Sequence, residues 1–264
     1  MRRNSSYYDI ERLFLRSIVA RDIADPLVLF DSQIPTDIVL PTMEEQLIEV
    51  AGVSEKGLVT GYILRPELGA GACGQFAHDF DEAIVLPDSA PLIDLVEALS
   101  RRPWVFVRML GIAGGIVPRN DLLDPPVRMW LFGMITVIEM RFLEMIEKRF
   151  GDESWKRLLS PARIEKAAEL LEERHRRKQR STLLECLQFS DKGQIVVRDE
   201  ILRQQVGFAS RHRGDEVIKS LERLRNNLAH SQDIVSSDWD TIVVLVKNLE
   251  RVIHLGADVQ DLGD

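Results

Sequence analysis

The sequence predicts a mixed α and β amino-terminal part followed by an all-helical carboxyl-terminal part, that is, an α+β fold joined to a helical bundle. Short β-type runs follow one another between residues 38 and 117, a pattern that favours strands. One amphipathic helix is expected among them at 90–100, where leucine and valine recur at helical spacing. After Asp124-Pro125-Pro126 the apolar residues keep a helical spacing, and proline commonly occupies the first turn of a helix. The predicted domains are a leading helix over 1–20, the mixed part over 21–124 and the helical part over 125–264.

The mixed part is expected to contain six short strands. Apolar spacing over 8–20 predicts the leading helix that precedes them. The glycine-rich segment 69–74 is expected to be a flexible loop, because Cys73 and His78 have no convincing set of further metal ligands nearby. The predicted strands are 38–40, 47–50, 58–63, 83–86, 104–107 and 115–117.

The helical part is expected to form an antiparallel bundle of four main helices. Two shorter helices, 182–189 and 198–208, are predicted to flank a turn at Asp191-Lys192-Gly193. The four main helices are predicted over 127–150, over 162–178, from about Gly214 through residue 230, and over 238–255.

Composition limits the class of protein. The chain has 264 residues, of which 45% are hydrophobic, enough for two folded domains with their own cores. Cys73 and Cys186 lie far apart, without the spacing of a metal site or a redox pair, so we expect buried thiols and no bound metal. The basic start of the chain is not followed by an apolar run, and the apolar stretch 129–146 is interrupted by charges. These features predict a cytoplasmic protein that does not enter a membrane.

Charge is unevenly distributed along the chain. Residues 1–124 carry 11 Lys and Arg against 19 Asp and Glu, whereas residues 125–264 carry 23 of each. A polyanion would therefore be repelled by the first part and tolerated by the second. The second part contains a basic run, which is either a solvated helix end or an RNA-binding surface. Its candidate RNA-binding residues are Arg174, Arg176, Arg177 and Lys178.

A polar motif, Arg225-Asn226-Asn227-Leu228-Ala229-His230, ends the third main helix. It combines a permanent cation, carboxamides and an imidazole, groups suited to holding a phosphate and moving a proton. Residues five apart on a helix are about 140° apart around its axis, so Asn226 and His230 share an outer side while Arg225 flanks the core stripe. That stripe is predicted to be Val217, Leu221, Leu224 and Leu228.

The motif resembles the signature of HEPN domains, all-helical modules of which many are metal-independent ribonucleases. The resemblance implies that two copies of the motif meet across a homodimer to form one RNA-cleaving site that needs no cofactor. It implies that His230 transfers protons, Arg225 stabilises the phosphorane and Asn226 positions the phosphate or His230, leaving cyclic phosphate ends. Glu139 is the candidate for an acidic residue that faces the motif arginine. The alternatives are ordinary polar residues at a helix end and a solvent-facing Glu139.

The mixed part contains an internal echo. The stretch 57–68 is repeated in outline by 114–122, each having glycine, a strand and an acidic residue shortly before leucine. With the helix and strands before it, this echo resembles cystathionine-β-synthase (CBS) domains, which occur in pairs and often bind adenine nucleotides between the copies. The resemblance implies AMP, ADP or ATP as a regulatory ligand, with Asp121 taking the ribose hydroxyls. Arg119 and Asn120 are the further candidate binding residues.

This sequence departs from the CBS pattern in both copies. Pro118 stands where the second copy should offer a hydroxyl, and Leu64 and Glu67 replace both polar positions of the first. The first copy is also expected to be shortened, without a long helix before its central strands. The pair therefore either binds a nucleotide or serves only for dimerisation or another sensory role.

Two functions follow from these patterns. One is a metal-independent ribonuclease with a CBS module that regulates it or brings two chains together. The other is a protein without catalysis, in which a CBS pair senses a nucleotide or dimerises and the helical bundle docks a partner.

Overall fold

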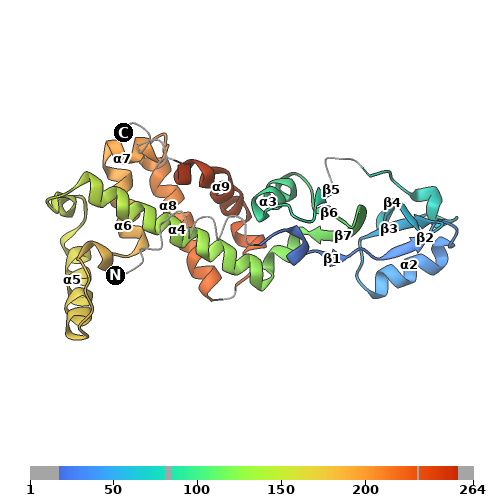
Figure 1. The fold of residues 1–264 in the computed structure, drawn as a ribbon, viewed down its shortest axis with the longest axis horizontal. Coiled ribbons are helices and arrows are strands. Elements are labelled where there is room, and N and C mark those ends of the chain that lie inside the picture. The colour runs from blue at the N-terminus through green and yellow to red at the C-terminus, as the bar shows by residue number, and fades with distance from the viewer. Residues whose placement is uncertain (1–17, 81–84, 231, 255–264) are drawn as a thin grey trace. The chain divides into compact units, whose positions relative to one another are not determined.

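The computed structural model describes residues 18–80, 85–230 and 232–254, with side chains described as far as residue 247. These residues form two compact units that divide between Pro126 and Val127, here called the α/β unit and the helical unit (Figure 1). The leading helix expected over 8–20 lies almost entirely outside the described residues. Of its last residues, Val19 forms an isolated β-bridge with Pro91, and Ala20–Asp22 is a short 3-10 helix.

The α/β unit consists of two repeats with the same order of elements: a short strand, a helix, a hairpin and a 3-10 turn. In each repeat the short strand lies parallel to the first hairpin strand, and the two hairpin strands are antiparallel. The first repeat has β2 (Leu29–Asp31), α2 (Thr36–Glu45), β3 (Val50–Glu55), β4 (Leu58–Leu64) and a turn at Arg65–Glu67. The second has β5 (Val85–Pro87), α3 (Leu92–Arg101), β6 (Trp104–Met109), β7 (Ile112–Pro118) and a turn at Arg119–Leu123.

The strands form two sheets, ordered β2-β3-β4 and β1-β7-β6-β5. The added strand β1 (Asp25–Pro26) pairs antiparallel with β7, so the chain just before the first repeat is attached to the second. One hydrophobic cluster contains residues of both repeats, with Tyr62 and Phe106 ring centroids 5.0 Å apart and Phe80 and Phe106 centroids 4.9 Å apart. The repeats therefore share a core, because neither alone could bury these aromatic faces.

The strands predicted at 58–63, 104–107 and 115–117 are confirmed as parts of β4, β6 and β7. Within the predicted run 83–86, the described residues Val85 and Leu86 belong to β5. The helix predicted at 90–100 is confirmed as α3. It buries the expected apolar face: Leu92, Leu95, Val96 and Leu99.

The first repeat is not shortened, contrary to the sequence-based prediction. Its helix α2 has 10 residues, as does α3, and it occupies the region where a strand at 38–40 was expected. Val39 and Met43, four residues apart, are fully buried on its inner face. Pro41 is tolerated inside the helix because it lies on the exposed side, where water can satisfy the carbonyl that loses its donor.

One further prediction for the first repeat is wrong. The run 47–50 is mostly a turn in which Leu47 has a φ of 55°, and only Val50 belongs to a strand. The glycine-rich segment is a loop over residues 69–72, and Thr36 contacts it by donating its hydroxyl to the carbonyl of Gly69 at 2.6 Å and its N–H to the carbonyl of Gly71 at 2.9 Å. Cys73 at its end is fully buried, as expected for a thiol that packs in a core.

The helical unit consists of six helices in its described residues. The predicted main helices correspond to α4, α5, α8 and α9, and no described helix is both long and apolar enough to cross a membrane. The helices are α4 (Pro125–Arg149), α5 (Pro161–Arg176), α6 (Phe189–Arg198), α7 (Glu200–Gln205), α8 (Arg211–Ala229) and α9 (Val235–His254), with 3-10 turns at Ser154–Leu158 and Leu184–Cys186.

Helix α6 replaces the turn expected at residues 191–193. The short helix expected at 182–189 is not formed as predicted, because this run contains only the 3-10 turn Leu184–Cys186 before α6 begins at Phe189. Gly193 lies inside α6, and a Cβ there would come within 2.7 Å of Ile218 on α8. Gly214 on α8 faces Val197 of α6 in the same way, at 2.8 Å. These glycines let two helices approach closely, so Gly193 marks a packing contact and not a turn.

Candidate functional site

The predicted motif lies at the carboxyl end of α8. Arg225 is half-buried, Asn226 and His230 are exposed, and His230 is the C-cap residue, whose N–H donates to the carbonyl of Asn226. Within the described part of the chain, these three side chains form no hydrogen bond or ion pair. The buried stripe of α8 contains Leu221, Leu224 and Leu228 as predicted, but Ile218 in place of Val217. The polar groups of Arg225, Asn226 and His230 therefore have no partner among the described residues and could contact a ligand.

The neighbouring polar residues of α8 are engaged in packing. Asp238, in the first turn of α9, has a fully buried side chain that accepts from Arg223 Nε at 2.8 Å and Asn227 Nδ2 at 2.6 Å. Ser237 Oγ donates to the same carboxylate at 2.8 Å. Burial tends to raise the pKa of Asp238, but the hydrogen bonds from Asn227, Arg223 and Ser237 outweigh it and hold this pKa below its ordinary value.

Sequence reasoning missed Asp238 as a buried anchor and took it only as the start of the last helix. The signal was present in the spacing, because Ile234, Asp238 and Ile242 are four residues apart and all are buried. An acid on an apolar stripe requires donors, which α8 supplies. The second carboxamide of the motif, Asn227, is one of those donors and is not exposed with its neighbours.

A second anchor holds the end of α8 from α4. The guanidinium of Arg128 donates to the carbonyls of Asn227 at 3.0 Å and Leu228 at 3.2 Å, and to that of Gln232 at 2.8 Å. A cation at this position is also attracted by the negative end of the helix dipole, which stabilises the contact. Arg128 and Asp238 thus hold the α8–α9 connection from two sides.

The expectation that Glu139 faces the motif arginine is not met. Glu139 accepts from Lys192 Nζ at 2.8 Å, and this buried lysine also donates to the carbonyl of Leu187 at 2.7 Å. The physical reason is the antiparallel register of α4 and α8. Since Arg128 lies at the carboxyl end of α8, residues eleven positions further along α4 lie about 16 Å away along the helix, beside an earlier part of α8.

The candidate RNA-binding run lies away from the motif. The run occupies the carboxyl end of α5, a helix that comes after the carboxyl end of α4. The motif lies instead beside the amino end of α4, a helix of 25 residues (Figure 1). Arg176 and Arg177 both form ion pairs with Glu173, and Arg174 reaches Ser181 Oγ at 3.4 Å. Lys178 is exposed. One chain does not bring this run and the motif together.

The candidate nucleotide residues lie in the turn that ends the second repeat. The Oδ2 atom of Asp121 is buried without a hydrogen-bond partner among the described residues. Burial, together with the neighbouring Asp25 and Asp124 carboxylates, raises the pKa of Asp121 to about 7. Asn120 is exposed. Arg119 turns to α3, where its guanidinium donates to the carbonyl of Leu99 at 2.7 Å and that of Arg102 at 3.2 Å, so it caps this helix.

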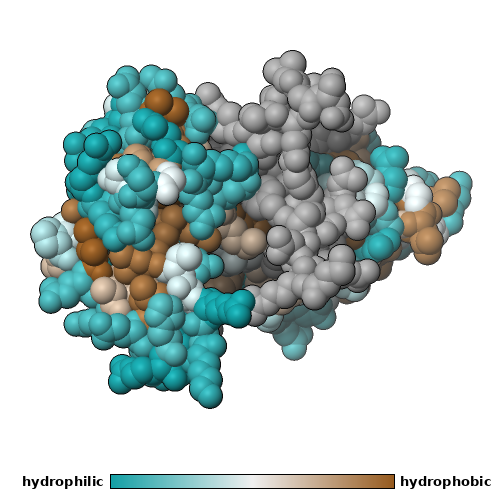
Figure 2. All heavy atoms as spheres, turned by 60° about the vertical axis from the view of Figure 1, so that its left-hand side comes forward, coloured by the Kyte–Doolittle hydropathy of each residue, from teal (hydrophilic) through white to brown (hydrophobic). Residues whose placement is uncertain are grey.

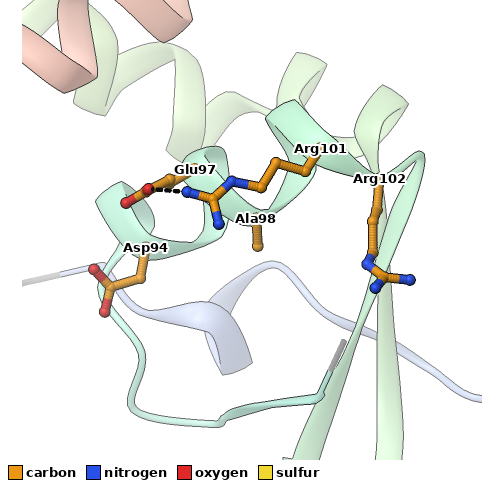
Figure 3. A pocket seen from close by; sticks show the side chains of 5 residues that line it. All are labelled: Asp94, Glu97, Ala98, Arg101 and Arg102. Carbon is orange, nitrogen blue, oxygen red and sulfur yellow. Dashed lines mark hydrogen bonds and ion pairs between the residues drawn. The ribbon is translucent and has the colours of Figure 1, made fainter. Parts of the chain in front are cut away.

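A hollow of about 550 Å³ lies over α3 (Figure 3). Glu97 and Arg101 face one another in it and form an ion pair at 2.6 Å. None of the predicted nucleotide residues lines it. Its lining is Asp94, Glu97, Ala98, Arg101 and Arg102.

The helical unit has an apolar groove of about 390 Å³ between α4, α8 and α9. Figure 2 shows hydrophobic residues gathered on one area of the molecule and framed by hydrophilic ones. The groove includes Ile138, Phe142, Val217, Leu221, Val244 and Leu245, and Arg213, Glu216 and Asp240 also line it. No group of three or more potential metal-ligating side chains occurs among the residues that the structure describes.

Comparison with known proteins found no matching family model and no matching curated protein. Solved structures of CBS domains are similar to part of this chain. The CBS domain of a bacterial CNNM/CorC family Mg²⁺ transporter is 15% identical over 47% of this chain and 85% of that one, with a TM-score of 0.36. CBSX2 in complex with AMP is 16% identical over 42% of this chain and 97% of that one, with a TM-score of 0.37. A conserved CBS domain protein of unknown function, TA0289 from Thermoplasma acidophilum, is 12% identical over 46% and 75%, with a TM-score of 0.36.

Proposed function

We propose that the α/β unit is a CBS pair that binds an adenine nucleotide and regulates the helical unit. The observation that supports this function most directly is the carboxylate of Asp121, which ends the second of two topologically equivalent repeats and has an oxygen with no partner among the described residues. A buried acceptor of this kind is costly unless a ligand supplies a donor. The two hydroxyls of a ribose are suitable donors.

The charges around Asp121 determine how a nucleotide would be oriented. Asp25 and Asp124 add negative potential, so the sugar is accommodated at Asp121 and the phosphates point away from it. Arg119 does not neutralise the phosphates, because its guanidinium caps α3. Asn120 is the exposed polar neighbour that remains for contact with the ligand.

Calorimetric titration with AMP, ADP and ATP tests this proposal. We expect binding at pH 8 that is lost in Asp121→Ala and kept in Asp37→Asn, an exposed acid in the first turn of α2. Since the ionised carboxylate is the better acceptor, affinity should fall as the pH is lowered from 8 to 6. Absence of heat and of thermal stabilisation at millimolar concentrations of all three nucleotides would contradict nucleotide sensing.

A second candidate function, metal-independent RNA cleavage by the helical unit, is favoured by a separate observation. Three side chains of the motif make no polar contact with the described residues, namely those of Arg225, Asn226 and His230. Arg223 and Asn227, on the same part of α8, both form hydrogen bonds with Asp238. The resemblance to HEPN ribonucleases gives these free groups a role. In that role two copies of the motif face one another in a homodimer.

The chemistry is an attack of the ribose 2′ oxygen on the adjacent phosphorus. His230 takes the proton from the 2′ hydroxyl or delivers one to the leaving 5′ oxygen, and the other proton transfer belongs to the His230 of the second chain. Arg225 stabilises the charge on the phosphorane and Asn226 orients a phosphate oxygen. The bond to the 5′ oxygen breaks and a 2′,3′-cyclic phosphate forms.

Incubation of the purified protein with mixed RNA in EDTA tests the cleavage proposal. Products with cyclic phosphate ends are expected with the unmodified protein and with His212→Ala, which removes an exposed histidine of the same helix. His230→Ala should lower the rate by about 100-fold or more. Equal RNA cleavage by His230→Ala and the unmodified protein would overturn it and leave a non-catalytic sensing or dimerising protein.

A further inference from the structure

The backbone of the connection between α8 and α9 is contacted by one side chain from the first turn of α4. Arg128 donates to the last two carbonyl groups before Ala229 and to the carbonyl of Gln232, on either side of His230. In this respect it differs from an arginine that merely pairs with an acid on the surface. A single planar guanidinium spans the turn that carries the imidazole.

The guanidinium is chemically suited to this contact. Its five N–H groups lie in one plane and can serve several carbonyl acceptors at once, whereas a lysine ammonium is a compact donor that lacks this fork. The carbonyls at a helix end also carry the negative end of the dipole, so the contact gains from charge as well as from hydrogen bonding. Loss of Arg128 would leave these acceptors to water.

The other anchor of this region does not replace Arg128. Asp238 holds Arg223 and Asn227 through their side chains, so it fixes the helix before the turn. Arg128 holds backbone atoms of the turn itself. Asn227 belongs to both contacts, because its carbonyl faces Arg128 while its amide faces Asp238.

We propose that Arg128 is a positioning residue that sets the conformation of the His230 turn, and this inference rests on the RNA-cleavage function proposed above. Arg128 is four residues after Asp124, the C-cap of the 3-10 turn that contains Asp121, and Pro125 and Pro126 lie between them. Prolines restrict the backbone at this junction. A restricted backbone just before Arg128 favours a fixed position of this residue in the first turn of α4.

Amide hydrogen exchange of residues 226–234 tests the conformational part. In Arg128→Ala we expect exchange about ten-fold faster or more across this segment, because two or more charge-assisted hydrogen bonds are lost. The exchange rate of Arg128→Lys should lie between those of the unmodified protein and Arg128→Ala. Millimolar guanidinium should restore slow exchange in Arg128→Ala. Arg149→Ala, at the opposite end of α4, should leave the segment unchanged.

RNA cleavage kinetics test the positioning role. Arg128→Ala should lower kcat by about 10- to 100-fold with little change in KM, because the imidazole is displaced without loss of RNA contacts. Unchanged exchange in Arg128→Ala overturns the inference whether or not the protein cleaves RNA, and so does faster exchange with an unaltered kcat. Failure of the cleavage proposal is recognised separately, by an unmodified protein that has no activity above that of His230→Ala. The positioning role of Arg128 is then overturned with it.

Discussion

Two aspartates illustrate how the surroundings decide what a carboxylate does. Asp238 is fully buried but receives three donors, so its charge is retained and it joins α8 to α9. Asp121 has a buried oxygen without a donor among the described residues and two acidic neighbours. The first carboxylate joins two helices, and the second is the one on which the proposed nucleotide site rests.

Replacement of Asp121 by asparagine should stabilise the protein above neutral pH. The folded pKa of Asp121, raised to about 7, exceeds the unfolded value, so ionisation disfavours the fold over the range between them and fully above pH 7. We expect Asp121→Asn to melt about 2–4 °C higher than the unmodified protein at pH 8, the shift that about 1 kcal/mol produces in a protein of this size. The difference should shrink as the pH falls from 7 towards 4, and a constant difference at all pH values would contradict it.

Removal of the Asp238 carboxylate should destabilise the protein, whereas removal of the Asp121 charge should stabilise it. Asp238→Ala leaves Arg223 and Asn227 without their acceptor, and we expect a loss of about 3 kcal/mol in the free energy of unfolding. Because the folded pKa is lowered, the contribution of Asp238 is present above the unfolded pKa and is lost as the pH falls through the folded value. Urea unfolding at pH 7 measures it, with the exposed Asp240→Ala as the matched control on the same helix. Equal stability of the two variants would show that the network contributes little.

At the scale of elements, close approach between α6 and α8 organises the helical unit. Nearly all of α6 is buried, including Lys192, which is satisfied by Glu139 and a carbonyl. Glycines on both helices make room for Ile218 and Val197. The sequence pattern did not predict the packing role of Gly193, because a glycine after two charged residues is typical of a turn.

Gly193→Ala should therefore destabilise the protein, although alanine is the better helix former. The added Cβ would lie 2.7 Å from Ile218, a buried side chain with little room to move. We expect a cost of about 1–3 kcal/mol, which exceeds the gain in helix propensity of about 1 kcal/mol. Gly151→Ala is the control, since nothing lies within 4 Å of its Cβ. A higher melting temperature for Gly193→Ala than for the unmodified protein would contradict the packing argument.

The two hairpins of the α/β unit share one turn geometry. Lys56 and Gly57 have φ values of 52° and 81°, and Leu110 and Gly111 have 51° and 89°. Left-handed backbone at both central positions is the type I′ turn, which suits the twist of a hairpin. A leucine in this conformation is strained, and Leu110 is also fully exposed.

Leu110→Asn should consequently stabilise the second hairpin. Asparagine adopts the left-handed conformation more readily than leucine does, and no buried contact is lost. A gain of about 0.5–1 kcal/mol in the free energy of unfolding is expected. Chemical denaturation of the variant, beside Leu110→Ala to separate turn geometry from loss of the apolar side chain, measures it. If alanine stabilises as much as asparagine, the backbone is not the cause.

At the scale of the whole molecule, the proposed functions belong to different units joined by a short proline-containing segment. The first half carries a net negative charge, whereas the charges of the second half balance, so the charge distribution favours the helical unit for the proposed RNA substrate. The basic run at the end of α5 and the motif at the end of α8 are separated within one chain. A homodimer is the arrangement that the cleavage proposal requires.

If the proposed site is shared by two chains, cleavage should depend on protein concentration. Sedimentation should give twice the mass of one chain at micromolar concentration, and the rate per chain should fall on dilution as the dimer dissociates. The matched control is Arg149→Ala, which alters a distant ion pair and should follow the same dilution curve. A rate per chain that stays constant while sedimentation shows dissociation would exclude a site shared by two chains.

Local pattern alone determined the division into an α/β half and a helical half, the face of α3, the strands β4, β6 and β7, and the exposed end of α8. These features depend on spacing of 2 or 3.6 residues and on neighbours along the chain, which a sequence displays directly. Tertiary structure alone decided that α2 and α6 are helices, that Arg119 caps α3, that Glu139 pairs with Lys192, and that Asp238 and Arg128 hold the motif. Each of these depends on a partner far away in sequence, and burial or a distant donor can outweigh the preference of a short segment.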